Sequence, residues 1–570
     1  MKKLISILLL AAMLVTTLAG CGTTLAEDDK GAIINVYIGS EISDYDPAVA
    51  YTDDSAVKVL GLVYEGLTRI NAKGQVEKAL MKSYEIKENP DKGEYSMIIT
   101  IKETKWSDGR VVSADDIVYA WKRILDPEFT CAAASLLFDI KNARDIKFGD
   151  NSIDDLGIAA IDTDEIEIQF EEKPDYDLFL ENLACLALVP LREDVVTRYD
   201  SFGTAVSTLC TNGPFAIKGI KAGEELMLER NLYYYRDTEA EEILDKYVIP
   251  YRLLINFADD EEANTTAFEN GDIFYLGEIG LSKRASYDAS GDVTKTDLLS
   301  THTYVFDTTN KLFSDANVRK ALSMALDRNE IVKLVTFAKP ATGLLPYSVY
   351  DKSVGDSFRT NGGDLISASA DVAGAKSLLN GKTGSFTLTH RDNALETTIA
   401  EYCKGVWEGL GFKVTLKALD AADFKEAYAE GDYDVIAIDY QCLSTDSFGA
   451  LSVFAPKFSG NALDIQNDNY DAVPFIQGYE NEALNEKIEA AYAEKDRAAR
   501  STYLHEAEAI LMEDMPVIPL IFNVDAYVYD SEILSGIKDT YYGYRNFNKV
   551  KMKGYLERQT TTAATTTAAE

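Results

Sequence analysis

Stretches with the periodicity of β-strands alternate along this chain with stretches of helical periodicity. In residues 412–416 apolar side chains occupy every second position, which is typical of a strand with one buried face, and residues 166–170 repeat the pattern. Residues 435–438 form a continuous apolar run, as in strands covered on both faces. From Asp315, the expected N-cap, the apolar positions instead follow helical spacing. A second helix covers residues 504–511 and ends before a strand at 517–522. This alternation predicts a mixed α/β fold.

The first 21 residues have the pattern of a cleaved export signal. Two lysines precede an apolar run from Leu4 to Leu18 that is too short to span a bilayer, and Leu18-Ala-Gly-Cys21 follows. This tetrapeptide resembles the bacterial lipobox, which implies removal of residues 1–20, diacylation of Cys21 and anchoring to the cell membrane outside the cytoplasm. The alternative is an ordinary signal peptide with a chance cysteine.

Both ends of the mature chain are predicted to lie outside the folded body. Residues 21–32 are small or charged and indicate a flexible linker, and residues 558–570 are a Thr- and Ala-rich tail of the kind that stays disordered. Beyond Cys21 no apolar run reaches the roughly 20 residues of a membrane-spanning helix. The hydrophobic content of 46% suffices for two or three cores, which predicts several domains.

Charge and cysteine content exclude several classes of partner. A formal net charge of -38 argues against binding to nucleic acid or to an anionic membrane surface, because both require clustered Lys and Arg. The same charge favours cationic ligands. Five cysteines remain after Cys21, and they are too sparse for a disulfide framework or a zinc site. They are Cys131, Cys185, Cys210, Cys403 and Cys442. Their pairing is left open.

The sequence contains no complete motif of enzymatic catalysis. His505-Glu506 begins like a zinc-protease helix, but Ala509 occupies the position of the second histidine ligand. Gly381-Lys382-Thr383 lacks the leading glycine of a phosphate-binding loop. The three histidines are far apart in sequence and form no metal-binding spacing. We therefore expect a protein that is not an enzyme and carries neither a metal nor another cofactor.

Five sequence blocks in a fixed order are similar to the family 5 extracellular solute-binding lipoproteins of ABC importers, which bind oligopeptides and dipeptides. Each block alone is weak, but together they extend over residues 33–555. They are 41–47 (EISDYDP) with 64–67 (YEGL), 105–109 (KWSDG) with 113–116 (SADD), 211–215 (TNGPF) with 228–231 (LERN), 318–322 (VRKAL) with 325–328 (ALDR), and 508–520 (EAILMEDMPVIPL).

The resemblance implies a two-lobed clamp of the type II periplasmic-binding-protein class with an additional inserted domain. Lobe 1 would consist of residues 33–64, 206–299 and 521–557, with the inserted domain at 65–205 and lobe 2 at 300–520. Most of the blocks are better explained by folding than by ligand contact. Asp108 and Gly109 are expected to form a turn, and we expect Arg319 and Arg328 to be solvated or paired locally on their helix.

The resemblance also places a candidate ligand-binding site in the cleft between the lobes. One segment follows the buried strand and contains Asp439, Tyr440 and Gln441, and the other is Tyr51, Thr52 and Asp53. In peptide binders of the family an aspartate near the first segment pairs with the ligand's amino terminus.

Here Leu443 stands at the position of that aspartate, and Ala437 stands where some members have an arginine. A buried ammonium group needs a counter-charge. We therefore hypothesise that Asp439 or Asp53 supplies it, and we interpret Asp446 as a structural residue. An extra loop at 462–477 is interpreted as a surface insertion, although it could reshape the mouth of the cleft.

The function that follows is capture of peptides by clamp closure and delivery to the permease subunits of an ABC importer by a lipid-anchored monomer. Three alternatives stay open. The same fold could bind a metal chelate, an opine or an oligosaccharide, the protein could be a surface sensor or adhesin without a role in transport, or it could be an extracellular hydrolase, which the failed motif search disfavours.

Overall fold

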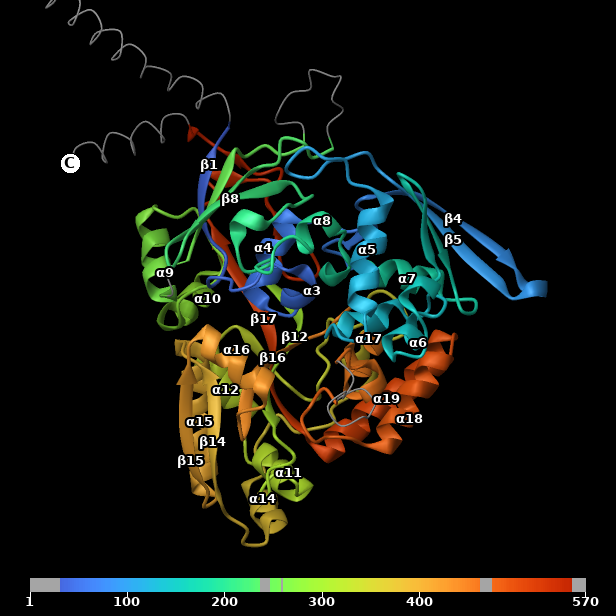
Figure 1. The fold of residues 1–570 in the computed structure, drawn as a ribbon. Helices are drawn as coiled ribbons and strands as arrows, with labels where there is room; N and C mark the ends of the chain where they lie inside the picture. The colour runs from blue at the N-terminus through green and yellow to red at the C-terminus, as the bar shows by residue number, and fades with distance from the viewer. Residues whose placement is uncertain (1–30, 236–246, 258–259, 462–473, 556–570) are drawn as a thin grey trace, which may run out of the picture.

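The computed structural model describes residues 31–235, 247–257, 260–461 and 474–555. The predicted export signal, Cys21, most of the linker, the tail, and residues 462–473 of the predicted loop lie outside these ranges. Two lobes lie one above the other in Figure 1, with a third part beside the upper lobe. Within the described ranges no helix is long and apolar enough to cross a membrane.

One eleven-stranded sheet runs through both lobes. Its order is β15-β14-β16-β12-β17-β11-β1-β10-β9-β8, and β13 pairs with β17 at the side. The strands are β1 (Ile33–Tyr37), β8 (Phe215–Lys221), β9 (Glu225–Arg230), β10 (Arg252–Asn256), β11 (Tyr275–Leu276), β12 (Thr294–Phe306), β13 (Ala338–Pro340), β14 (Ser385–Arg391), β15 (Lys413–Leu419), β16 (Val435–Gln441) and β17 (Val517–Tyr529).

The two longest strands of this sheet, β12 and β17, connect the lobes. Each has 13 residues, and they pair antiparallel along most of their length. Their register shifts between Asp297 and Thr301, and again between His302 and Thr303. The first irregularity spans the predicted boundary between residues 299 and 300. The domain limits drawn from the sequence stay predictions, and the hydrogen-bonding pattern changes at one of them.

Lobe 2 packs helices on the strands of its half of the sheet around a separate core. Trp407 and Leu322 are fully buried there, and the Trp407 indole donates to the carbonyl of Leu322 at 3.0 Å. The helices around this core are α11 (Ala316–Met324), α12 (Arg328–Val335), α14 (Val372–Leu379) and α15 (Ala394–Gly409). Five further helices of lobe 2 bury residues in the larger cluster that includes lobe 1 and the inserted part: α13 (Phe358–Gly362), α16 (Ala421–Glu430), α17 (Ser447–Leu451), α18 (Glu482–Ala493) and α19 (Arg497–Asp514).

The inserted part has a four-stranded antiparallel sheet of its own. Its strands β4 (Met81–Asn89) and β5 (Glu94–Ile101) form the long hairpin that projects to the right in Figure 1. The other elements are β6 (Ile158–Asp162), β7 (Glu165–Gln169), α5 (Ala114–Leu125), the 3-10 helices η2 (Ala132–Leu137) and η4 (Leu186–Leu188), α6 (Ala143–Lys147), α7 (Tyr176–Asn182) and α8 (Glu193–Val196). Lobe 1 contributes α3 (Pro47–Ala50), α4 (Asp54–Val63), α9 (Glu261–Asn270) and α10 (Arg284–Ser290).

The secondary structure expected from periodicity is confirmed. Asp315 caps α11 by accepting from the Asn317 amide at 2.9 Å, and α19 ends two residues before Pro516, where β17 begins at the next position. The predicted turn is also present, since Asp108 accepts from the Arg110 amide and Gly109 has a φ of 92°. All five described cysteines are free.

The expectation for Arg319 and Arg328 was wrong about solvation and incomplete about their partners. Both are buried, at 5% and 1% exposure. Each has a local partner, Phe313 for Arg319 and Ser323 for Arg328, and each also donates to backbone carbonyls far away in sequence. Arg319 bonds the carbonyls of Asp514 and Met515 at the end of α19, and Arg328 bonds that of Pro519 in β17 at 2.8 Å. The two guanidinium groups therefore tie helices of lobe 2 to β17 and to the α19 terminus, a long-range role that local spacing on a helix cannot reveal.

The inserted part also touches lobe 2. The Cys131 amide donates to the Gly460 carbonyl at 2.8 Å, and the Tyr492 hydroxyl donates to the Phe138 carbonyl at 2.8 Å. Arg497, the first residue of α19, pairs with Asp175 at 2.5 Å. These contacts close one side of the space between the lobes.

Candidate ligand-binding cleft

Polar side chains gather where the lobe 2 strands end at the boundary between the lobes. Because β14 and β16 are parallel, their carboxyl ends lie at the same edge of the sheet. Arg391 is the last residue of β14, and Asp439 lies near the end of β16. His302 of β12 is directly opposite Asp439, and Asn523 of β17 reaches the same point. We call these four residues the hinge cluster.

Asp439 is the centre of the hinge cluster. Its carboxylate lies 3.0 Å from Nδ1 of His302, accepts from the Asn523 amide at 3.0 Å and lies 3.7 Å from the Arg391 guanidinium. Arg391 also pairs with Glu396 at 2.9 Å and lies over the ring of Phe424. Asp439 thus already has protein partners, yet 34% of its side chain is exposed.

The pKa shifts of Asp439 and His302 favour the charged form of both side chains. Burial disfavours the ionised carboxylate of Asp439, but the charge and hydrogen bond of His302, together with Arg391, outweigh it and hold the pKa well below its usual range. Burial likewise disfavours protonated His302, and Asp439 outweighs that effect and raises the pKa of the imidazole. The pair therefore favours an ionised aspartate beside a protonated histidine.

The second predicted segment faces this cluster from lobe 1. Asp53 is exposed and caps α4 by accepting from the Ala56 amide at 2.8 Å. Burial lowers the pKa of Arg391, but the carboxylates of Glu396, Asp439 and Asp53 together raise it above its ordinary value. Asp53 and Asp439 thus both influence the Arg391 guanidinium from opposite lobes, and of the two Asp439 lies within ion-pair distance of it, at 3.7 Å.

The two predicted tyrosines are directed into apolar surroundings. Tyr440 is 6% exposed, packs against Phe454 and donates its hydroxyl to the Ala450 carbonyl. Tyr51 lies against Cys131 and Cys185, and burial raises its pKa well above the ordinary value. The two other predicted residues, Thr52 and Gln441, are exposed and half-buried, respectively.

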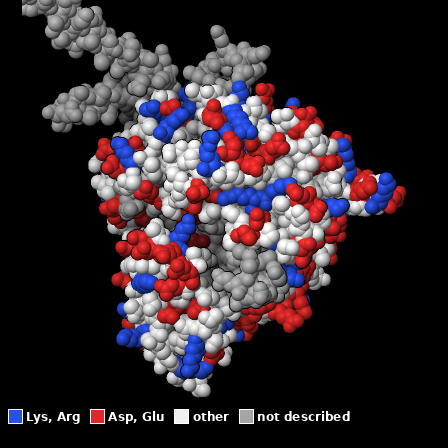
Figure 2. All heavy atoms as spheres, in the orientation of Figure 1, with Lys and Arg blue, Asp and Glu red and all other residues white. Residues whose placement is uncertain are grey.

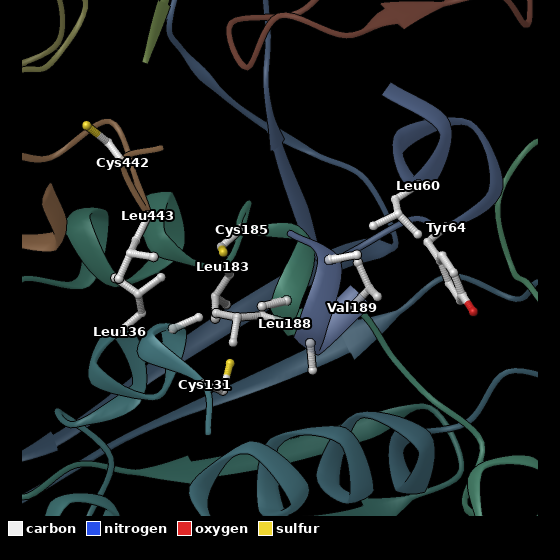
Figure 3. Close-up of a cluster of buried hydrophobic side chains, with 14 of the residues drawn as sticks. Leu60, Tyr64, Cys131, Leu136, Leu183, Cys185, Leu188, Val189, Cys442 and Leu443 are labelled. Atoms are coloured by element: carbon white, nitrogen blue, oxygen red, sulfur yellow. The ribbon is translucent and has the colours of Figure 1, made fainter. Parts of the chain in front are cut away.

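Leu443 belongs to an apolar wall between lobe 2 and the inserted part. It is 4% exposed and lies in one hydrophobic cluster with Leu136, Cys185 and Cys442. Figure 3 shows the Leu443 and Leu136 side chains directed toward one another from the segment after β16 and from η2. Leu443, which stands at the position of the family's amine-pairing aspartate, therefore makes a packed apolar contact.

Sequence reasoning missed three members of the hinge cluster. His302 was grouped with the isolated histidines, and neither Arg391 nor Asn523 was considered. No strand was predicted over residues 385–391, so the sequence offered no signal for Arg391 at the carboxyl end of β14. His302 and Asn523 are 137 and 84 positions from Asp439, and only the antiparallel pairing of β12 with β16 and β17 unites them.

Figure 2 shows the surface hollowed where the two lobes meet, with acidic side chains beside the hollow.

The family described as bacterial extracellular solute-binding proteins, family 5 (middle), matches residues 75–461. The chain belongs to this family. The family 5 protein is similar to the oligopeptide-binding protein OppA of Bacillus subtilis (strain 168), with 27% identity over 561 residues, 94% of this chain and 97% of the relative.

Solved structures share the fold of this family 5 protein. Peptide-bound Listeria monocytogenes OppA has a TM-score of 0.78 at 20% identity and covers 92% of this chain and 99% of its own. AgaA of A. tumefaciens R10, in complex with agropinic acid, has a TM-score of 0.73 at 18% identity, covering 91% and 99%. They confirm the two-lobed clamp, and since their ligands differ chemically, the clamp alone does not fix the ligand.

Proposed function

We propose that this solute-binding protein captures peptides outside the cell and delivers them to the permease of an ABC importer. The observation that carries the proposal is the similarity to an oligopeptide-binding protein over 94% of the chain. The charged hinge cluster at the boundary between the lobes agrees with it, because a peptide offers backbone amides, carbonyls and charged ends to such a cluster.

Closure of the clamp is the proposed mechanism. A ligand that contacts Asp53 on lobe 1 and the hinge cluster on lobe 2 gains both sets of contacts only when the lobes approach. It therefore shifts the population toward the closed form, which the permease would recognise. No bond is made or broken, and the protein is proposed to act as a monomer without a cofactor.

The experiment that tests the function uses the mature protein. Mass spectrometry after gentle denaturation identifies any ligand retained in the cleft, and calorimetric titration with a peptide library, with small-angle scattering in parallel, measures binding and closure. We expect peptides to bind and to reduce the radius of gyration. Retention of a sugar or a metal complex, together with a flat response to peptides, would overturn the proposal.

A contact between the ligand's amino terminus and Asp439 or Asp53 is the residue-level prediction from the sequence. Substituting both residues with asparagine (D53N/D439N) is expected to weaken binding of a free-amino peptide at least tenfold if either carboxylate makes that contact. Isothermal titration calorimetry measures the change. An exposed control that also loses two carboxylate charges is the double variant D177N/D432N. Unchanged affinity in the double variant would remove the assignment.

We further propose that a lipid on Cys21 anchors the protein. Replacing Cys21 with serine is expected to move the protein from the membrane fraction to the medium or the periplasm, because a diacylated cysteine is the proposed anchor. Cell fractionation and immunoblotting measure the distribution. Full retention of the C21S variant in the membrane fraction would show that another anchor operates.

A second candidate ligand class is a non-peptide solute such as an opine. Two observations favour it, namely the apolar Leu443 at the position the family uses for the amine contact and the agropinic acid complex of a protein with the same fold. Calorimetric titration with opines, beside the peptide library, distinguishes the two classes.

A further inference from the structure

A buried carboxylate lies at the seam between the inserted part and lobe 2. Glu181 of α7 is 3% exposed, and the Thr445 hydroxyl donates to it. Thr445 lies in the segment that follows β16 of lobe 2, 264 positions away. This hydrogen bond therefore crosses the space that opens when the clamp opens.

Glu181 has no cationic partner among the described residues. The two nearest guanidinium groups are engaged elsewhere, since Arg497 pairs with Asp175 and Arg500 pairs with Asp446. Thr445 supplies the one hydrogen bond recorded for the Glu181 side chain within the described ranges. Burial raises the pKa of Glu181 to about 7, and the nearby charge of Asp446 adds to the rise. The Thr445 hydrogen bond and the more distant charges of Arg497 and Arg500 oppose this rise without cancelling it.

The other groups that face Glu181 are phenols. Tyr350, Tyr541 and Tyr542 all lie close enough for Glu181 to raise their pKa values. The Tyr542 hydroxyl is buried and has no hydrogen-bond partner in the described part of the chain. The same phenol lies near Cys185 and Cys442 of the apolar wall. One side of the seam thus holds a carboxylate and a free hydroxyl, and within the described residues neither forms a direct ion pair.

A buried carboxylate without a direct ionic partner is expected to oppose closure of the empty clamp. In an open form we expect Thr445 to move away with lobe 2 and water to solvate Glu181, and closing would remove that water. A ligand with a positive group would replace the lost solvation by a counter-charge. The free-energy cost of desolvating Glu181 then applies when the clamp closes empty or around a neutral ligand.

We propose that Glu181 is the counter-charge for a cationic group of the ligand, an ammonium or a guanidinium, that is enclosed when the clamp closes. This inference rests on the proposed peptide-binding function. The group has two possible sources, the amino terminus or a basic side chain. Three peptides of one length separate them: a free-amino peptide without Lys or Arg, its N-acetylated form, and an N-acetylated form with one Lys.

The pH dependence of binding differs between these peptides. The pKa of Glu181 is near its ordinary value of 4.5 when solvated and about 7 when enclosed without a cation. Closure around a neutral ligand then takes up a proton, so affinity for it falls by roughly fortyfold between pH 5 and pH 7. Closure around a cation keeps Glu181 ionised, so the affinity for a cationic peptide stays nearly constant over that range.

The test measures the affinity of the mature protein for the three peptides at pH 5 and pH 7 by calorimetry. Wild type is expected to give the two contrasting profiles. Glu181→Gln should abolish the pH dependence for the neutral peptide and weaken the cationic peptide at least tenfold at pH 7. Glutamine mimics the protonated acid and keeps an acceptor for Thr445. Asp177→Asn, an exposed site on the same helix, should change neither profile.

The outcomes separate this inference from the function on which it rests. Equal pH profiles for cationic and neutral peptides in wild type would overturn the role of Glu181 while peptide binding stands, even if the variant did not fold. An unchanged ratio of the two affinities in E181Q would do the same. Absence of binding by any peptide would overturn both the proposed function and this inference.

Discussion

Replacing Glu508 with alanine is expected to lower the free energy of unfolding by about 3–5 kcal/mol. Glu508 of α19 is fully buried and pairs with Arg359, whose side chain is also fully buried. It accepts in addition from the backbone amides of Leu344 and Leu345 at 2.9 and 3.0 Å. Alanine would leave a buried guanidinium without its counter-charge and two amides without an acceptor. Urea unfolding followed by tryptophan fluorescence measures the loss.

Two variants control this expectation. Glu506→Ala removes an exposed carboxylate of the same helix that pairs with Lys487 at 2.7 Å, and a change within about 0.5 kcal/mol is expected. The double variant R359M/E508L replaces the pair by apolar side chains and should recover much of the stability lost in E508A. A loss below 1 kcal/mol in E508A would contradict the role assigned to the pair.

Asp439→Asn is expected to lower the pKa of His302 and to destabilise the protein by about 2 kcal/mol at pH 5.5. In the folded protein Asp439 raises the pKa of His302 above 6.5. That part of the stability is therefore present below pH 6.5 and disappears as the pH rises through the raised folded value. The difference between wild type and D439N should consequently be smaller at pH 8.5.

Nuclear magnetic resonance can follow the histidine directly, because the chain has three histidines. Asp432→Asn, an exposed acid just before β16, serves as the matched control and should leave the His302 titration unchanged. An unaltered His302 pKa in D439N would show that the aspartate does not set the charge of the hinge cluster.

Local patterns predicted the elements well because each depends on neighbours within a few positions. The cap of α11 at Asp315 and the start of β17 after Pro516 are of this kind. The burial of Arg319 and Arg328 could not be predicted in the same way, since several of their partners are carbonyls of residues 514, 515 and 519, almost 200 positions away. The contacts of His302 with Asp439 and of Thr445 with Glu181 also join residues far apart in sequence, so local patterns could not predict them.

The recognisable sequence blocks maintain the frame of the clamp more than they define its ligand. Glu508 is the first residue of the last block, and its carboxylate pairs with Arg359. Gly213, in the block at 211–215, is essential for close packing of two backbone segments. A Cβ at Gly213 would lie 2.5 Å from the carbonyl carbon of Val63. Such residues establish the family, whereas Asp53, Glu181 and Leu443, at which the ligand is chosen in our proposals, lie outside the blocks.

The pairing of β12 with β17 restricts how the lobes can move. Two adjacent strands joined by hydrogen bonds form a ribbon that bends easily across its flat face and resists shearing within its plane. Because the pairing is interrupted beside residues 297–301, we expect the lobes to swing about this point along a limited arc. The empty protein would then sample few relative orientations of the lobes, and ligand binding would cost little orientational entropy.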